Sequence, residues 1–268
     1  MAKITVEQEN GVARVTFANP ERRNAMDDGF FAELTSIMTT LGRDEGVRTI
    51  VLAAQGPIFC AGGDLNWMAK GAKYDRAENI ADMRSLGDML RTINETPRPV
   101  IARVQGPAYG GGVGLLCVCD VVLAVAHAKF SLSETRLGLI PGVISPFVIA
   151  ALGPRQSRRY ALTGELFGAQ AALDIGLVHE IVAEDALDGR IAEIADNIRK
   201  GGPQAVAGSK ALMRRVAWRP VDDALMSETA ELIADVRAGA EAAEGIAAFL
   251  EKRRPNWLDP DGSGSDER

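Results

Sequence analysis

The fold is decided by two stretches, "TIVLAAQGPIFCAGGDL" (49–65) and "PVIARVQGPAYGGGVGL" (99–115). Each begins with an apolar run that has the length and composition of a buried strand, passes through a glycine-rich turn and enters a helix. Such strand, turn and helix successions build crossover connections between parallel strands. The sequence therefore predicts an α/β fold with a largely parallel sheet.

The two glycine-rich junctions also carry a chemical prediction. The first turn of a helix presents backbone N–H groups that lack intrahelical partners and carry the positive end of the helix dipole. Glycine lets a ligand oxygen approach these groups, because no side chain stands in the way. Two converging junctions would form an oxyanion hole, although either junction alone is more often a tight packing turn.

The remaining elements follow from local patterns. Two alternating runs at 4–9 and 12–17 flank Asn10 and Gly11, which predicts a hairpin with a two-residue turn. Apolar residues at helical spacing predict a helix within 26–44. Further strands are expected within 120–126, 128–134 and 178–184, and helices within 146–164 and 168–176. From about Ala186 to Arg253 the pattern is helical, with breaks near 201–206 and 219–223.

Composition excludes several classes of protein. The 268 residues carry a formal net charge of -6, which disfavours a nucleic-acid binder that works by neutralising phosphates. No apolar run is long enough to span a bilayer, and the N-terminus alternates apolar and polar residues where a signal peptide would have an apolar run. We therefore expect a cytoplasmic protein without nucleic-acid or membrane partners. The three cysteines, Cys60, Cys117 and Cys119, fit a reduced interior.

Common cofactor and nucleophile motifs are incomplete. The glycine cluster lacks the third glycine of a dinucleotide-binding loop, since Leu115 stands in its place. A phosphate loop and a serine nucleophile elbow are missing as well. Strand-like residues flank His127 and His179, and the three cysteines with His127 lack metal-finger spacing. The sequence thus predicts neither a metal nor a redox cofactor.

Four ordered motifs resemble the enoyl-CoA hydratase/isomerase (crotonase) family over about residues 5 to 257. They are "FCAGGDL" (59–65), "GPAYGGGVGLLCVCD" (106–120), "FSLSETRLGLIPG" (130–142) and "EGIAAFLEKRRPNW" (244–257). The resemblance implies a crotonase-like spiral of ββα units followed by a helical trimerisation region, in homotrimers or dimers of trimers. The expected divisions are a catalytic core at 1–190, an oligomerisation region at 191–257 and a disordered tail at 258–268.

The resemblance also implies the site. The family's oxyanion hole falls on the N–H groups of Gly63 and Gly111. Of the family's two catalytic carboxylates, the second aligns with Glu134, whereas the first falls on Gly114 and is therefore missing. The segment "NPERRNAM" (19–26) resembles the part of the family beside the coenzyme A ribose and pyrophosphate. The coenzyme A contacts carry over onto Arg23, Ala25, Ala61, Asp64 and Leu65.

The implied activity is hydration of an acyl-CoA thioester, with Glu134 as the single acid and base. Leu132, Leu137 and Leu139 indicate a partly buried segment that would raise the pKa of Glu134. Coenzyme A enters as part of the substrate. Two alternatives remain: a Δ3,Δ2-enoyl-CoA isomerase, for which one glutamate suffices, and a non-catalytic acyl-CoA-binding relative.

Within the family, the sequence is most similar to bacterial hydratases of branched glutaconyl-CoA thioesters, such as methylglutaconyl-CoA or isohexenylglutaconyl-CoA hydratase. Such enzymes act in leucine or acyclic-terpene breakdown. The absence of a side chain at Gly114 would make room for a branched acyl group. Candidates for contacting its distal carboxylate are Arg136, Arg155 and Arg159, for which solvation at the surface is the alternative.

Overall fold

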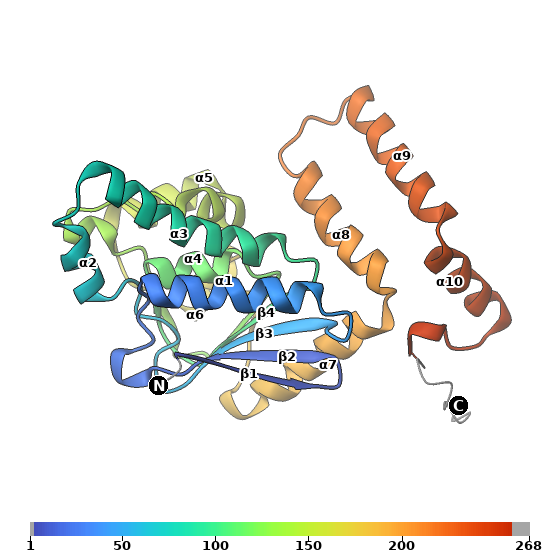
Figure 1. Cartoon of the computed structure of the whole chain (residues 1–268), viewed down its shortest axis with the longest axis horizontal. Helices are drawn as coiled ribbons and strands as arrows, with labels where there is room; N and C mark the ends of the chain where they lie inside the picture. Colours follow the sequence, from blue (N-terminus) through green and yellow to red (C-terminus); the bar gives the residue numbers. More distant parts are fainter. Residues whose placement is uncertain (1–2, 259–268) are drawn as a thin grey trace. The chain divides into compact units, whose positions relative to one another are not determined.

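The computed structural model describes residues 3–258 of the chain (Figure 1). The chain divides into two compact units, with the boundary between Ile194 and Ala195. Within the described part of the first unit, the main sheet has six strands in the order β1-β2-β3-β4-β6-β9, and a second sheet has three in the order β5-β7-β8. The strands of the main sheet are β1 (Ile4–Glu9), β2 (Val12–Phe17), β3 (Thr49–Ala54), β4 (Val100–Val104), β6 (Val121–Ala124) and β9 (Glu180–Ile181); those of the second are β5 (Ala108–Tyr109), β7 (Lys129–Ser131) and β8 (Phe167–Gly168).

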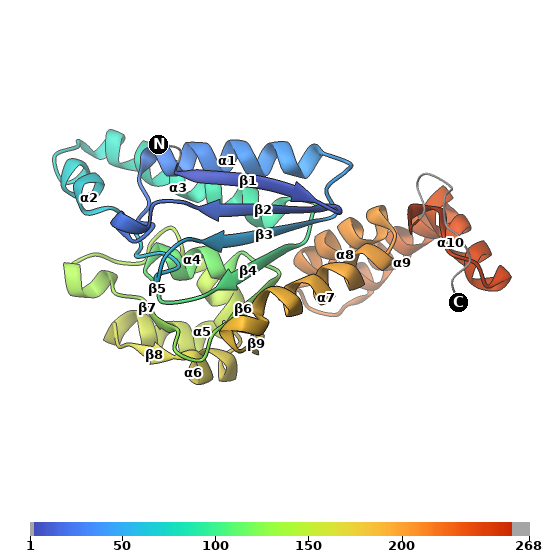
Figure 2. The same cartoon turned by 90° about the horizontal axis from the view of Figure 1, so that it is seen from below.

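The hairpin and the parallel sheet were both predicted correctly. β1 and β2 pair antiparallel, and the residues between them, Asn10 and Gly11, both have positive φ values of 51° and 77°. Such a turn matches the right-handed twist of its strands. β2, β3, β4, β6 and β9 all pair in parallel (Figure 2). The two-residue strand β8 was not predicted, because so short a segment shows no alternation of apolar and polar residues.

The helices of the first unit lie where the sequence placed them, except for α3, which was not predicted. They are α1 (Asp28–Arg43), α2 (Leu65–Gly71), α3 (Arg76–Glu95), α4 (Gly111–Cys117), α5 (Ser145–Thr163), α6 (Ala169–Asp174) and the start of α7 (Leu187–Lys200). α1 begins at the cap Asp27, whose side chain accepts a hydrogen bond from the N–H of Phe30. α5 is broken inside by Gly153, which has φ 72° and precedes Pro154.

The core lies between the main sheet and its covering helices. Every residue of β3 is buried, as expected for a central parallel strand. α1 turns Phe30, Leu34 and Met38 inward, and these side chains are at most 2% exposed. Figure 1 shows α1 alongside the sheet with α3 packed against it. This rigid layer holds the ends of β3 and β4, from which the two glycine-rich junctions leave.

The second unit is helical, as predicted, with α8 (Pro203–Val216), α9 (Asp223–Ala238) and α10 (Ala240–Glu251). The predicted breaks fall before α8 and α9, where Gly202 and Asp222 cap the helices. The expected tail at 258–268 lies, from residue 259, outside the described residues. Within residues 3–258, the helices are all too short or too polar to cross a bilayer.

Candidate active site

The two glycine-rich junctions meet at the edge of the main sheet. A parallel bridge joins Cys60 to Ala108, and the N–H of Tyr109 donates to the carbonyl of Cys60 at 3.0 Å. A Cβ atom built on Gly62 would lie 2.9 Å from the Tyr109 carbonyl oxygen and 3.7 Å from the Gly111 nitrogen. Only glycine permits this approach, since Gly62 also has a φ of 88°. The convergence expected from the sequence is therefore present.

Two backbone N–H groups at this meeting point are free. Among residues 3–258, no acceptor takes a hydrogen bond from the N–H of Gly63 or of Gly111. Gly111 is the first residue of α4, so its N–H belongs to the unpaired first turn. A Cβ on Gly63 would come within 2.9 Å of the Trp67 ring, and one on Gly111 within 2.7 Å of Met26 Cε. Both amides are available to an acceptor carried by a ligand.

The Glu134 carboxyl group lies beside the second junction. Its Oε1 would be 3.1 Å from a Cβ atom on Gly110, the residue directly before Gly111. Gly110 has φ 51° and donates its N–H to the Ser131 carbonyl at 2.9 Å, which ties the junction to the strand that leads to Glu134. The carboxyl and the free amide of Gly111 are thus brought to one place by residues that are far apart in the sequence.

The environment of Glu134 favours its protonated form. Its Oε2 is buried and has no hydrogen-bond partner within the described residues. Burial raises the pKa of Glu134 above its ordinary value of 4.5. The expected apolar neighbours account for this only in part, because Leu132 is buried while Leu137 and Leu139 are 59% and 51% exposed. The carboxyl itself lies close to the Gly110 turn.

Gly114 does not open a space for ligand, contrary to the expectation from the sequence. A Cβ atom on Gly114 would lie 2.5 Å from Ile144 Cγ2 and 2.9 Å from Ile144 Cβ. Ile144 precedes α5 and is only 3% exposed. The volume that a side chain at position 114 would need is filled by Ile144, so α4 and the start of α5 are in close contact there.

The residues expected to contact coenzyme A lie on two segments that are joined by backbone hydrogen bonds. The N–H of Ala61 donates to the carbonyl of Arg23 at 3.0 Å, and that of Asp64 donates to the carbonyl of Met26 at 2.7 Å. Leu65 is 74% exposed, and Ala25 is half-buried. These segments form one continuous strip at the edge of the site.

The side chain of Asp64 already has a structural role. It caps α2 by accepting hydrogen bonds from the N–H groups of Asn66 and Trp67, and it pairs with Arg22 at 3.2 Å. A carboxylate held in this way would repel phosphate groups. We therefore expect this position to meet a ligand through its backbone.

Two of the thiols and one of the imidazole groups have no chemical role suggested by their surroundings. Burial raises the pKa of the Cys60 and Cys117 thiols to about 12, so both stay protonated and unreactive near neutral pH. His179 Nδ1 accepts a hydrogen bond from the N–H of Val122 at 3.0 Å, which assigns this histidine to strand packing. Glu134, in contrast, places a carboxyl group beside the free amide of Gly111.

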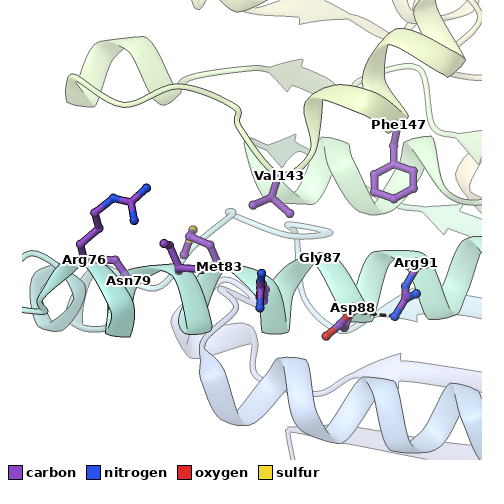
Figure 3. A pocket seen from close by; sticks show the side chains of 10 residues that line it. Arg76, Asn79, Met83, Gly87, Asp88, Arg91, Val143 and Phe147 are labelled. Carbon is purple, nitrogen blue, oxygen red and sulfur yellow. Dashed lines mark hydrogen bonds and ion pairs between the residues drawn. The ribbon is translucent and has the colours of Figure 1, made fainter.

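A cavity of about 630 Å³ lies between α3 and the start of α5 (Figure 3). Its lining residues are Arg76, Asn79, Ile80, Met83, Arg84, Gly87, Asp88, Arg91, Val143 and Phe147. None of the arginines singled out from the sequence lines it, and Arg159 pairs with Glu165 at 2.8 Å instead. The sequence analysis missed the arginines of α3, although Arg76 and Arg84 stand on either side of Ile80 at four-residue spacing, which places all three on one ridge of the helix.

Comparison with known proteins identifies the family of this chain. The model of the family described as enoyl-CoA hydratase/isomerase matches residues 7–260. The chain is 34% identical over 246 residues to enoyl-CoA hydratase ACTT6 of Alternaria alternata, covering 91% of this chain and 80% of that protein. It is 30% identical over 259 residues to 2,3-dehydroadipyl-CoA hydratase of Escherichia coli, covering 96% and 99%.

Among solved structures, an enoyl-CoA hydratase from Shewanella pealeana superimposes with a TM-score of 0.93 at 38% identity, covering 96% of each chain. The chain belongs to the enoyl-CoA hydratase/isomerase family, and its fold is the one that family shares.

Proposed function

We propose that the protein is an enoyl-CoA hydratase in which Glu134 is the only catalytic carboxylate. The observation that carries this proposal is the position of the Glu134 carboxyl beside Gly110, next to the free N–H of Gly111. This closeness supports a shared role in which the carboxyl transfers protons and the N–H binds an oxyanion. The names of the relatives support hydration as the reaction.

The proposed reaction begins when a water molecule adds to the β-carbon of the conjugated thioester. The Glu134 carboxylate takes one proton from this water, and the electron pair of the double bond moves to the thioester oxygen. The N–H groups of Gly63 and Gly111 bind the resulting enolate oxygen. The protonated Glu134 then delivers its proton to the α-carbon, so that water and proton add to the same face.

The raised pKa of Glu134 suits this cycle. An acid and base works best when its pKa lies near the operating pH, and burial moves the pKa of Glu134 upward from 4.5. The buried Oε2 has no hydrogen-bond partner within the described residues, which leaves the charged form of the carboxyl poorly stabilised. A carboxylate whose oxygens were both held by arginine would have a lower pKa and would be a weaker base.

We further propose a substrate of the glutaconyl type, branched and with a distal carboxylate, as formed in leucine or acyclic-terpene breakdown. One relative is named for a dehydroadipyl-CoA, an acyl group with a distal carboxylate. A closed homotrimer, or a pair of trimers, is the proposed assembly.

A Δ3,Δ2-enoyl-CoA isomerase is the second candidate, because Ile144 fills the place where a second carboxylate would stand. In that reaction Glu134 removes a proton from C2 of a 3-enoyl thioester and returns it to C4, without added water.

The test incubates the protein separately with crotonyl-CoA, 3-methylglutaconyl-CoA and 3-hexenoyl-CoA and identifies the products by mass spectrometry. Products heavier by one water support the hydratase. Conversion of 3-hexenoyl-CoA into its 2-enoyl isomer alone would support the isomerase. Binding of all three thioesters without any product would leave a non-catalytic acyl-CoA-binding protein.

A further inference from the structure

The peptide that carries the first proposed oxyanion donor joins two glycines, Gly62 and Gly63. Such a peptide can rotate as a unit at little steric cost, because neither of its residues has a Cβ atom. Rotation would turn the carbonyl of Gly62 toward the ligand and the N–H of Gly63 away from it. An oxyanion hole at this place therefore requires contacts that hold this one peptide.

The segment around Met26 holds the peptide from one side. The N–H of Met26 donates to the carbonyl of Gly62 at 2.8 Å, and the N–H of Asp64 donates to the carbonyl of Met26 at 2.7 Å. The carbonyl and the N–H of a trans peptide point in opposite directions. The bond to the Gly62 carbonyl therefore directs the N–H of Gly63 away from Met26.

The indole ring of Trp67 lies against the same backbone. A Cβ atom on Gly63 would be 2.9 Å from Cζ3 and 3.2 Å from Cε3 of this ring. Trp67 belongs to α2, which begins two residues after Gly63. The ring therefore restricts the movement of the Gly63 backbone, provided that the ring itself is fixed.

Two other helices fix the indole ring. Its Nε1–H donates to Oδ1 of Asp82 in α3 at 3.0 Å. It also makes an edge-to-face contact with Phe31 of α1, with ring centroids 5.3 Å apart and an interplanar angle of 84°. Phe31 is 1% exposed, so its ring belongs to the core. Trp67 thus connects the Gly63 backbone to the helical layer that covers the main sheet.

Asp82 is a costly residue to place beside Trp67. Its second oxygen, Oδ2, is buried and has no hydrogen-bond partner within the described part of the chain. A buried carboxylate oxygen without a partner lowers stability. The hydrogen bond to the indole is therefore better explained by the position it gives to Trp67 than by a gain in stability.

We propose that Trp67 and Asp82 are positioning residues that hold the N–H of Gly63 in the orientation needed to bind the thioester oxygen. The inference rests on the proposed function, because it assumes that the thioester oxygen binds at Gly63 and Gly111. Both side chains act through the backbone of Gly63. Without the hydrogen bond between them, the indole is free to tilt and the peptide between Gly62 and Gly63 loses its second support.

The test measures the hydrogen bonds to the thioester oxygen without turnover. Butyryl-CoA labelled with carbon-13 at the thioester carbonyl cannot be hydrated, and the infrared frequency of this carbonyl falls as hydrogen bonds to its oxygen strengthen. Asp82→Leu removes the acceptor with little change in size, Asp82→Asn keeps an acceptor oxygen, and Trp67→Phe removes the donor. The control is Asp174→Leu, because the exposed Asp174 accepts a hydrogen bond of similar length, 2.9 Å, from Gln170 within α6.

Asp82→Leu should return the carbonyl frequency of bound butyryl-CoA toward its value in water. It should also lower kcat for crotonyl-CoA about tenfold, whereas the Kd of butyryl-CoA should change less than about twofold. Asp82→Asn and Asp174→Leu should keep the wild-type frequency and kcat. Trp67→Phe should lower kcat at least as far as Asp82→Leu. Adding Asp82→Leu to Trp67→Phe should cause no further loss, because the indole donor is already gone.

An Asp82→Leu variant with the wild-type frequency and kcat would overturn the inference. A fall in kcat without a change in frequency would overturn it as well, and so would an equal loss in Asp82→Asn. If Asp82→Leu does not fold, Trp67→Phe decides by the same two measurements. Hydration of crotonyl-CoA by the wild type tests the proposed function alone, so either idea can fail while the other holds.

Discussion

Gly114, which has no side chain, lies directly against the buried side chain of Ile144. A Cβ atom on Gly114 would be 2.5 Å from Ile144 Cγ2, too close for any real contact. Glycine inside a helix normally costs about 1 kcal/mol relative to alanine. The close approach of α4 to the segment before α5 explains why this cost is tolerated at position 114.

Gly114→Ala should therefore destabilise the protein, although replacing glycine by alanine inside a helix usually increases stability. Overpacking of a well-filled core costs about 1–3 kcal/mol, more than the gain in helix propensity. Urea denaturation measures the change in the free energy of unfolding. The matched control is Gly208→Ala in α8, where a Cβ would meet nothing within 4 Å, and which should stabilise the protein by about 0.5–1 kcal/mol.

The same contact couples the two positions. Ile144→Ala should restore part of the stability lost in Gly114→Ala, because it removes the atoms that clash. Gly114→Glu should likewise be tolerated only together with Ile144→Ala. Additive losses in the double variant would show that the two side chains do not compete for one space.

The sequence predicted the local elements well and the packing of the site poorly. The bounds of β1, β2 and β3 and the convergence of the two junctions follow from alternation, turn chemistry and the order of strands. The contact between Gly114 and Ile144 depends on how closely α4 approaches the start of α5. No local sequence pattern predicts the distance between two helices. For the same reason the arginines of α3 were overlooked, since their common cavity forms only when Val143 and Phe147 face them.

Glu134→Gln should lower kcat for hydration by about a hundred- to ten-thousandfold, because it removes the proton carrier and little volume. The Kd of butyryl-CoA should change less than about twofold. Glu7→Gln, on the exposed face of β1, provides the matched control and should leave kcat unchanged. Retention of most of the hydration activity by Glu134→Gln would rule out the single-carboxylate mechanism.

The burial of Glu134 also predicts how stability depends on pH. Its pKa in the folded state lies above the ordinary value of 4.5, so the unfolded chain releases this proton first as the pH rises. The stability that this group contributes is complete below about pH 4.5 and is lost as the pH rises through the folded-state pKa. The free energy of unfolding of the wild type minus that of Glu134→Gln should therefore fall between pH 4 and neutral pH.

The contribution of Asp188 to stability should depend on pH in the opposite direction, so Asp188→Asn serves as the control. Hydrogen bonds from Arg103 and then Arg14 lower the pKa of Asp188 from 3.8 to about 2. Its contribution is present above pH 3.8 and is lost as the pH falls toward 2. A difference between wild type and Glu134→Gln that rises with pH, as expected for Asp188→Asn, would contradict the burial of the Glu134 carboxyl.

The second unit should assemble through its exposed apolar side chains. Ile233 and Val236 of α9 are 62% and 51% exposed, and Phe249 and Leu250 of α10 are 83% and 73% exposed. Surfaces of this kind usually mark an interface. Light scattering should give the mass of a trimer or hexamer, and Phe249→Asp should shift it toward the monomer. A wild-type protein that stays monomeric at micromolar concentration would refute the proposed assembly.

The role of Gly111 as an oxyanion donor can be separated from its role in packing by two substitutions at that position. Gly111→Ala and Gly111→Pro both place a Cβ near Met26 Cε, a terminal methyl group that can move. Proline fits the first position of a helix, as Gly111 is in α4, but it lacks the N–H. The proline variant should therefore have a kcat about a hundred- to a thousandfold below that of the alanine variant, with similar melting temperatures.

Both variants should bind butyryl-CoA with similar Kd, because the donor acts mainly on the charge that develops during the reaction. If the two variants hydrate crotonyl-CoA at comparable rates, the N–H of Gly111 does not stabilise the enolate and the glycine serves packing alone.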